Sequence, residues 1–379
     1  MRAAVLVDVN RLEVRDVPCI SPAPHEVRVR VDAVGLCGTD LHIVHGHANY
    51  NFDAQGRVRP LREQPQILGH EIAGTVHEVG ARVKGLSPGD RVIMDQGRCC
   101  VSEWRDPLCE YCRSAASHQC ERYSEHGITG LPGGFAEFIT IPGRNAVRVS
   151  TGIAAEHAAL SEPLGCVIHA SEMVAHAQSR YTLGGTGDAA VRSVLICGGG
   201  PAGLLFVQHL RRVVGFGGRI LVSEPSAHRR ALAERFGADT VDPTSVSLVE
   251  WVDEWTSGRR VEYVIEASGA GAVFSAIPGL LRKQGTVLLY GHGHAGVDLS
   301  VMNQVQFLEP TLVSPVGASG GHDPEGRPLT YLQALHSLER GTVDVAPLVT
   351  HRYASLEELP QAFAGAHQQP DYVKGVLTL

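Results

Sequence analysis

Long apolar runs are missing from this sequence. No stretch of its 379 residues approaches the about 18 uninterrupted apolar residues that a membrane-spanning helix needs. The apolar run after Met1 ends at Asp8, too early for the core of a secretion signal. The 33 Lys and Arg residues form no long basic block and are outnumbered by 40 Asp and Glu residues. We therefore expect a cytoplasmic protein with a small-molecule partner, and neither nucleic acid nor a membrane as a partner.

The length of the chain predicts two domains, and the pattern of predicted strands and helices changes near residue 165. Before that point short strands predominate, because Val27, Val29 and Val31 alternate with charged residues and similar runs occur at 72–79 and 91–94. After it, apolar runs at 194–197, 219–222, 263–265 and 287–290 alternate with segments of helical pattern at 202–214 and 229–236. A further helix is expected at 331–340 and a closing strand at 373–379. The pattern predicts an α/β protein in which a β-rich domain accompanies a parallel sheet covered by helices.

A glycine cluster follows the apolar run 194–197 and opens a helical segment, the context in which G-x-G-x-x-G binds a dinucleotide. The first glycine allows the tight turn, the second lets the backbone approach a pyrophosphate, and the third lets helix and strand pack closely. Free N–H groups at the helix N-terminus then face the phosphates. The residues of this candidate site are Gly198, Gly200, Pro201, Ala202 and Gly203.

Glu224 follows the next apolar run, at about the distance expected for a residue that accepts hydrogen bonds from the adenosine ribose. A carboxylate there repels a 2′-phosphate, so we expect NAD rather than NADP. Arg229 lies close by in the sequence and keeps NADP open, because an arginine can hold that phosphate.

A thiolate, an imidazole and a carboxylate make a common zinc set, and three protein ligands leave a fourth position for water or substrate. Three separate segments offer such groups. Cys37 lies in Gly-Leu-Cys-Gly-Thr-Asp, His70 and Glu71 follow Gly69, and Glu162 lies in Ser-Glu-Pro-Leu.

These motifs, in this order, resemble the zinc-dependent medium-chain alcohol dehydrogenase family over nearly the whole chain. Residues 69–80 resemble its zinc signature, and residues 37–42 resemble its first-ligand segment. Residues 162–164 resemble the third-ligand segment of its sorbitol and polyol dehydrogenase branch. The resemblance implies a GroES-like catalytic domain over 1–165, completed by 310–379, and a Rossmann domain over 166–309.

The resemblance further implies that catalytic zinc binds Cys37, His70 and Glu162, with Glu71 as a nearby carboxylate that can also ligate. Thr39 and His42 match residues that relay the alcohol proton to solvent in related dehydrogenases, a task that suits the pKa of histidine. The implied reaction transfers a hydride between NAD(H) and a small polar secondary alcohol or its ketone: a polyol, cyclitol, amino alcohol or diol. Relatives form homodimers or homotetramers.

Nine cysteines are present, and clustered cysteines in a chain without an export signal favour metal over disulfides. Cys109, Cys112 and Cys120 resemble the last three ligands of the family's structural zinc lobe. The usual first cysteine is replaced by Asp106, so the fourth ligand is Cys100, Cys99 or Asp106. We favour Cys100; a chain without a second zinc remains an alternative.

Two other functions compete with the zinc dehydrogenase. One is a zinc-free enone or quinone reductase of the same superfamily, and the other is a non-catalytic nucleotide-binding relative. The zinc-free reductase does not explain why Cys37, His70 and Glu162 occur together. The non-catalytic relative explains neither this ligand set nor the candidate proton relay.

Overall fold

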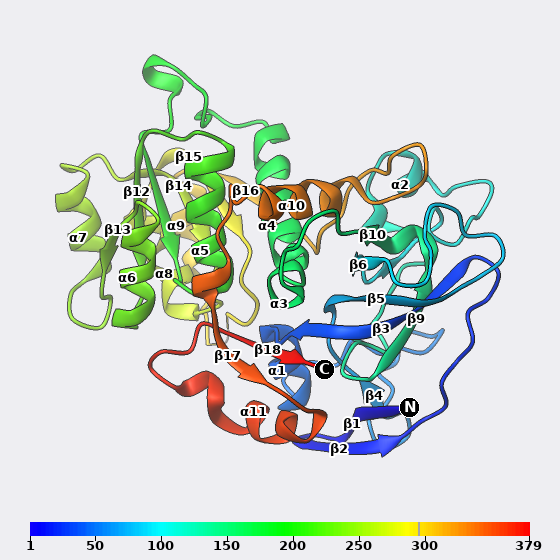
Figure 1. Cartoon of the computed structure of the whole chain (residues 1–379). Coiled ribbons are helices and arrows are strands. Elements are labelled where there is room, and N and C mark those ends of the chain that lie inside the picture. Colours follow the sequence, from blue (N-terminus) through cyan, green and yellow to red (C-terminus); the bar gives the residue numbers. More distant parts are fainter. Residues whose placement is uncertain (295) are drawn as a thin grey trace. The chain divides into compact units, whose positions relative to one another are not determined.

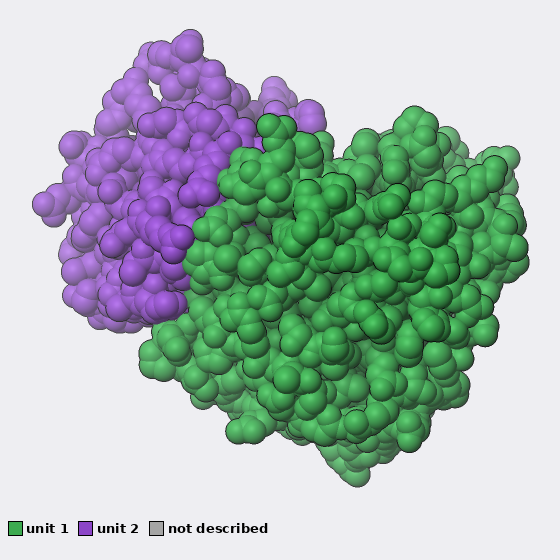
Figure 2. Space-filling view, viewed as in Figure 1, with its two compact units in different colours: residues 1–165, 317–379 green, residues 166–316 purple. Residues whose placement is uncertain are grey.

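The structure is a computed structural model that describes residues 1–294 and 296–379. The chain divides into two compact units (Figure 2). Unit 1 comprises Met1–Gly165 and Gly317–Leu379, and unit 2 comprises Cys166–Val316. The second domain is predicted to end at residue 309, whereas the sheet of unit 2 continues to β16 (Thr311–Val313). None of the helices in the described residues is both long and apolar enough to cross a membrane.

Unit 1 is built on a seven-stranded sheet (Figure 1). In its main path the order is β10-β6-β5-β3-β18-β17, and β9 also pairs with β3. These strands are β3 (Glu26–Gly35), β5 (Glu71–Val79), β6 (Arg91–Met94), β9 (Phe138–Pro142), β10 (Ala146–Arg148), β17 (Val349–Tyr353) and β18 (Lys374–Thr378). Val27, Val29 and Val31 point into the core, as their alternation with charged residues predicts. Antiparallel pairing of β18 with β3 brings the last strand of the chain beside one of the first.

The remaining elements of unit 1 are short. β1 (Arg2–Asp8), β2 (Arg11–Asp16) and β4 (Gln66–Ile67) form a small sheet, and β7 (Gly97–Arg98) pairs with β8 (Ser124–Glu125). The α-helices are α1 (Gly38–Val44), α2 (Glu110–Arg113), α3 (Ala155–Ala158), α10 (Leu329–Glu339) and α11 (Leu359–Gly365), and α4 (Ser161–His176) begins here. Single 3₁₀ turns are η1 (Ser117–Gln119), η2 (Gly143–Asn145), η5 (Ala346–Leu348), η6 (Leu356–Glu358) and η7 (Ala366–Gln368).

Unit 2 contains a six-stranded parallel sheet in the order β13-β12-β11-β14-β15-β16. Numbered along the chain, this is the order 3-2-1-4-5-6 of dinucleotide-binding domains, which confirms the predicted fold class. The strands are β11 (Ser193–Cys197), β12 (Arg219–Ser223), β13 (Asp239–Val241), β14 (Val261–Glu266), β15 (Leu281–Leu289) and β16.

Helices cover both faces of this sheet. Leu195 and Cys197 face the side where α7 (Leu248–Trp255), α8 (Gly271–Leu280) and α9 (Val301–Gln306) pack. Ile196 faces the opposite side, toward α5 (Pro201–Gln208), because alternate side chains of a strand point to opposite faces. α5 continues into a π-helical turn, η4 (His209–Val213), and is followed by α6 (Ala227–Arg235); η3 (Gly187–Ala189) precedes β11.

Candidate metal centres and nucleotide site

Cys37 is distant in sequence from the adjacent residues His70 and Glu71, yet the three residues bring one ligand atom each within 4.8 Å of the others. Cys37 lies just before α1, and Glu71 is the first residue of β5. His70 and Glu71 are buried. Buried Glu71 Oε2 has no hydrogen-bond partner in the described part of the chain. Burying such a polar atom unsatisfied is costly, so the thiol, imidazole and carboxylate fit a zinc ion.

One carboxylate fixes the two ligand-bearing segments relative to each other. Asp40 is fully buried in α1; its Oδ2 accepts the Cys37 N–H at 2.9 Å, and its Oδ1 accepts the Gly69 N–H at 3.2 Å. The same Oδ1 lies 3.4 Å from His70 Nδ1. Burial by itself lowers the pKa of His70, but Asp40 and Cys37 outweigh it and raise that pKa well above its usual value. The surroundings of the imidazole thus favour positive charge, whether from a proton or from a metal ion.

Glu71 is also bound by a residue from the other end of the chain. The Lys374 ammonium, at the start of β18, forms a buried ion pair with Glu71 Oε1. Burial lowers the pKa of Lys374, but the carboxylate beside it outweighs that effect and the pKa is raised. Sequence reasoning missed Lys374, and only the pairing of β18 with β3, itself paired with β5, explains how it reaches Glu71.

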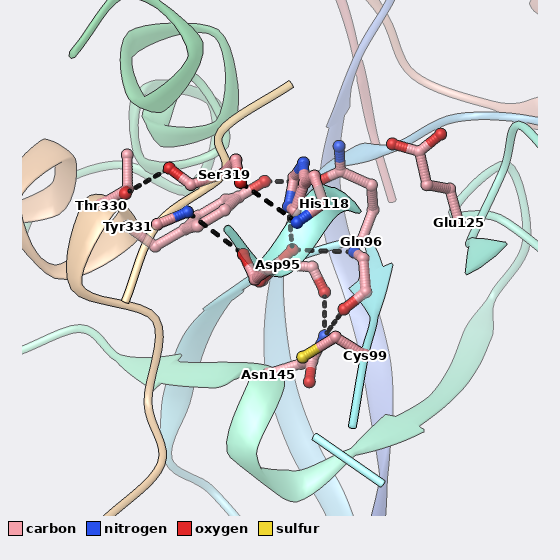
Figure 3. Close-up of polar contacts among 12 residues, drawn as sticks. Asp95, Gln96, Cys99, His118, Glu125, Asn145, Ser319, Thr330 and Tyr331 are labelled. Atoms are coloured by element: carbon pink, nitrogen blue, oxygen red, sulfur yellow. Dashed lines mark hydrogen bonds and ion pairs between the residues drawn. The ribbon is translucent and has the colours of Figure 1, made fainter. Parts of the chain in front are cut away.

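Glu162 does not belong to this close group. It lies in the first turn of α4, is 5 % exposed, and its Oε1 accepts a hydrogen bond from Gln96 Nε2 at 3.1 Å. Gln96 in turn accepts a hydrogen bond from the Tyr331 hydroxyl; both residues lie in the buried polar cluster of Figure 3. The role of Glu162 as a ligand therefore remains a prediction, and its polar neighbours were not predicted from the sequence.

The two candidate proton-relay residues both lie on α1. Thr39 Oγ1 is 3.7 Å from Cys37 Sγ, which places this hydroxyl beside the ligand group. His42 is half-buried one turn further along, and its ring centroid lies 6.0 Å from that of His47. Their roles as relay residues remain predictions.

The second ligand group consists of four thiols, Cys100, Cys109, Cys112 and Cys120, within 4.8 Å of one another. Sγ–Sγ distances of 3.6 Å and 3.8 Å, from Cys120 to Cys100 and to Cys109, are far longer than a disulfide of about 2.05 Å. The Cys112 N–H lies 3.5 Å from Cys109 Sγ. This N–H and that of Glu121 lower the pKa of Cys109 to about 6, which favours its thiolate, whereas burial raises the pKa values of Cys112 and Cys120.

The structure brings Cys100, rather than either alternative, to these three cysteines. Cys99 is buried, but its Sγ faces His322 Nε2 at 3.8 Å. Asp106 is exposed between Cys100 and α2. Four clustered thiols, three of them buried, are the usual ligands of a structural zinc.

The glycine cluster of unit 2 lies between β11 and α5, as predicted. Gly198 has φ +101°, in the left-handed region, and a Cβ at Gly203 would overlap the carbonyl oxygen of Gly198. Gly200 is the N-cap of α5, Pro201 occupies its first turn and Ala202 follows. The turn therefore has the close helix–strand approach and open helix N-terminus that a pyrophosphate needs.

Glu224 follows β12 and contacts this turn. Its Oε2 accepts the Gly199 N–H at 2.7 Å, and its Oε1 accepts the Ser226 N–H at 2.9 Å. Arg229 Nη1 lies 3.9 Å from Glu224 Oε1, so the arginine lies beside the carboxylate. The carboxylate is thus already held at the end of β12 where a ribose would bind.

Two family domains match the sequence. Residues 23–151 match the alcohol dehydrogenase GroES-like domain, and residues 201–334 match the zinc-binding dehydrogenase domain. L-threonine 3-dehydrogenase from Pyrococcus furiosus is 33 % identical over 349 residues, which are 92 % of this chain and 89 % of that protein. The chain belongs to the zinc-dependent medium-chain alcohol dehydrogenase family.

Other relatives place this dehydrogenase in the polyol- and threonine-dehydrogenase-like branch. Sorbitol dehydrogenase from Arabidopsis thaliana is 28 % identical, over 100 % of this chain and 95 % of that one. A zinc-binding dehydrogenase from Sinorhizobium meliloti, solved bound to NADP, has a TM-score of 0.80 at 27 % identity, covering 100 % and 99 % of the two chains. The GroES-like and Rossmann fold, the zinc dependence and the alcohol oxidoreductase class predicted from the sequence are therefore confirmed.

Proposed function

We propose that this dehydrogenase transfers a hydride between NAD and a small polar secondary alcohol: a polyol, cyclitol, amino alcohol or diol. The observation that carries the proposal is the group formed by Cys37 with the buried residues His70 and Glu71, oriented by Asp40. A zinc-free enone reductase has no use for this group, and a non-catalytic nucleotide-binding protein has no use for Thr39 beside it.

In this proposal Cys37 and His70 hold the catalytic zinc together with a carboxylate, Glu162 or Glu71. When bound, zinc supplies a Lewis acid that makes an alcohol much easier to deprotonate and stabilises negative charge on oxygen. Asp40 fixes the orientation of the His70 ring, and Lys374 holds one oxygen of Glu71. The Thr39 hydroxyl accepts the alcohol proton as it gives up its own proton toward solvent, and His42 is the outer group of the relay that exchanges the proton with water.

Glu224 supports NAD over NADP. Its carboxylate is held at the end of β12 by two backbone N–H groups, where negative charge opposes a 2′-phosphate. Arg229 lies beside that carboxylate, which leaves it less available to a phosphate. We expect Glu224→Ala to weaken NAD binding and to raise relative affinity for NADP; unchanged selectivity would remove this assignment.

The substrate class is supported by the printed activities of relatives, which include L-threonine 3-dehydrogenase and sorbitol dehydrogenase. The test is a screen for NADH absorbance with polyols, cyclitols, amino alcohols and diols, with zinc quantified in the same sample. Turnover of one of these classes that follows zinc content supports the proposal. Alcohol-dependent NADH formation in a zinc-free sample would contradict the role of the metal. A zinc-free sample that oxidises no alcohol but consumes NADH with an enone or quinone would instead indicate the reductase type.

We further propose that two copies pair along β16, the edge strand of the sheet of unit 2, to form a homodimer or half of a homotetramer. Leu312 on this strand is exposed, and so are Phe307 and Val316 on either side of it. An exposed edge strand among apolar side chains favours pairing with another strand. Leu312→Lys should lower the mass found by analytical ultracentrifugation, and an unchanged mass would place the interface elsewhere.

A further inference from the structure

A directional chain of hydrogen bonds ends on Glu162. The Tyr331 hydroxyl donates to Gln96 Oε1, and Gln96 Nε2 donates to Glu162 Oε1 at 3.1 Å. Tyr331 is 0 % exposed and Gln96 is 2 % exposed. We propose that Gln96 and Tyr331 are positioning residues that fix the orientation of the Glu162 carboxylate for the catalytic metal site. This inference rests on the proposed function, which gives Glu162 a place in that site.

The direction of these hydrogen bonds follows from the chemistry of the Gln96 amide. A glutamine side chain presents an oxygen that only accepts and a nitrogen that only donates. Because the Glu162 carboxylate only accepts, the nitrogen of Gln96 must face it, and the amide oxygen therefore faces the Tyr331 hydroxyl, which donates to it. The reversed amide would point its oxygen at a carboxylate, which is repulsive in a buried site. Tyr331 therefore acts on Glu162 through Gln96.

The backbone around Gln96 is held firmly enough for such a role. Asn145 Nδ2 donates to the carbonyl oxygen of Asp95 at 2.8 Å and to that of Gly97 at 2.6 Å, one on each side of Gln96. The carbonyl oxygen of Gln96 accepts the His126 N–H at 3.0 Å. With its backbone fixed at three consecutive carbonyls, Gln96 can move little except by rotating its side chain.

Hydrogen bonds join the helix that carries Tyr331 to the cysteine lobe, the segment 99–120 that carries the four clustered thiols. Thr330, beside it on α10, donates to the carbonyl oxygen of Ser319 at 3.1 Å, and Ser319 Oγ accepts the His118 N–H at 3.1 Å. His118 lies in η1, just before Cys120, and its Nε2 is 3.5 Å from Asp95 Oδ1. Figure 3 shows His118, Asp95, Gln96 and Tyr331 converging from these separate elements. The network thus holds both ends of the Tyr331–Gln96 hydrogen bond.

The experiment compares Tyr331→Phe, Gln96→Leu and the double variant. Four quantities are measured on the full-length zinc protein: the rate at which a chelator removes catalytic zinc, the visible d–d spectrum after cobalt substitution, kcat and KM. Each single variant should release catalytic zinc about 10–100-fold faster or lose kcat by the same factor. The four-thiol zinc should be retained, and the cobalt spectrum should shift in the same direction as the shift expected for Glu162→Gln, which is measured alongside.

The double variant provides the sharpest readout. Because Tyr331 acts through Gln96, adding Tyr331→Phe to Gln96→Leu should change nothing further, whereas independent structural effects would add. Matched controls are Tyr263→Phe, a buried tyrosine of unit 2, and Gln66→Leu. The side-chain atoms of Gln66 are buried without a hydrogen-bond partner in the described residues, so its loss should leave the metal site unchanged.

The results separate this inference from the proposed function. Suppose that zinc binding requires Cys37, but that Tyr331→Phe and Gln96→Leu match wild type in zinc release, cobalt spectrum and kinetics. This result would overturn the positioning role alone. Additive effects, or effects no larger than those of the two controls, would overturn it as well. Zinc retention and turnover that do not depend on Cys37 would overturn both proposals. Should Gln96→Leu fail to fold, Tyr331→Phe, which removes only an oxygen atom, decides the outcome.

Discussion

The Asp40 carboxylate lies 3.4 Å from the Nδ1 atom of His70 while it accepts hydrogen bonds from the N–H groups of Cys37 and Gly69. A single side chain thereby orients a ring and holds both segments that carry the ligands. Its charge also raises the pKa of His70 despite the opposing effect of burial.

Asp40→Asn keeps the shape of this side chain but removes its charge. We expect catalytic zinc affinity or kcat to fall about 10–100-fold, because carboxylates that orient a ligating histidine have effects of this size. Zinc competition with a chromophoric chelator and steady-state kinetics measure the two quantities. Zinc affinity and turnover equal to wild type would show that Asp40 has no orienting role.

Lys374→Met leaves the Glu71 carboxylate buried without its partner. Removing one member of a buried ion pair typically destabilises a protein by about 3–5 kcal/mol, because the remaining charge is uncompensated. The double variant Lys374→Met with Glu71→Gln should recover much of that loss. Urea unfolding measures both variants, and a single variant as stable as wild type would argue against the pair.

Cys99 and Cys100 form a matched pair for testing the cysteine lobe, since they are adjacent and both buried. Wild type should bind two zinc ions per chain, one for each ligand group. Cys100→Ser should lose one zinc and become less stable, because structural zinc contributes to folding. Cys99→Ser should retain both. Elemental analysis decides, and equal zinc contents in the two variants would contradict the assignment.

The buried residue His209 makes stability depend on pH independently of both candidate metal-ligand groups. Burial lowers the pKa of His209 to about 4, below its ordinary 6.5. The unfolded chain therefore binds a proton that the folded chain does not between these values, and stability falls as the pH drops below about 6.5. His209→Leu removes this contribution to the pH dependence of stability.

The comparison is made between pH 7.5 and pH 5. At pH 5 the free energy of unfolding of His209→Leu should rise by about 2 kcal/mol relative to that of wild type, compared with the difference at pH 7.5. The reason is that pH 5 lies about 1.5 units below the pKa of the histidine in the unfolded chain. Thermal unfolding at both pH values measures the change. A gap between variant and wild type that does not vary with pH would mean that His209 is not held neutral by burial.

Local patterns predicted much of the fold. The alternating valines of β3 and the apolar run of β11 specify strands through their own periodicity, and the spacing of glycines predicted the turn before α5. Cys37 and His70 were found because motifs of fixed spacing carry them. Such signals need only neighbouring residues, so sequence reasoning can use them directly.

The polar partners of the site could not be found in this way. Lys374 reaches Glu71 across 303 residues, and Tyr331 reaches Gln96 across 235. Neither lysine nor tyrosine has a local pattern that predicts burial, and their contacts arise from strand pairing and helix packing. The choice of Cys100 over Cys99 depends likewise on which of two adjacent thiols faces α2.

The most direct test of the account is turnover that depends on zinc bound through Cys37. Wild type and Cys37→Ser are stripped by chelator, reconstituted with zinc, and assayed for alcohol-dependent NADH formation alongside zinc content and NAD binding. We predict that zinc restores activity only to wild type, while Cys37→Ser retains NAD binding and the four-thiol zinc. Alcohol oxidation by the stripped protein, or by reconstituted Cys37→Ser at the wild-type rate, would contradict the account.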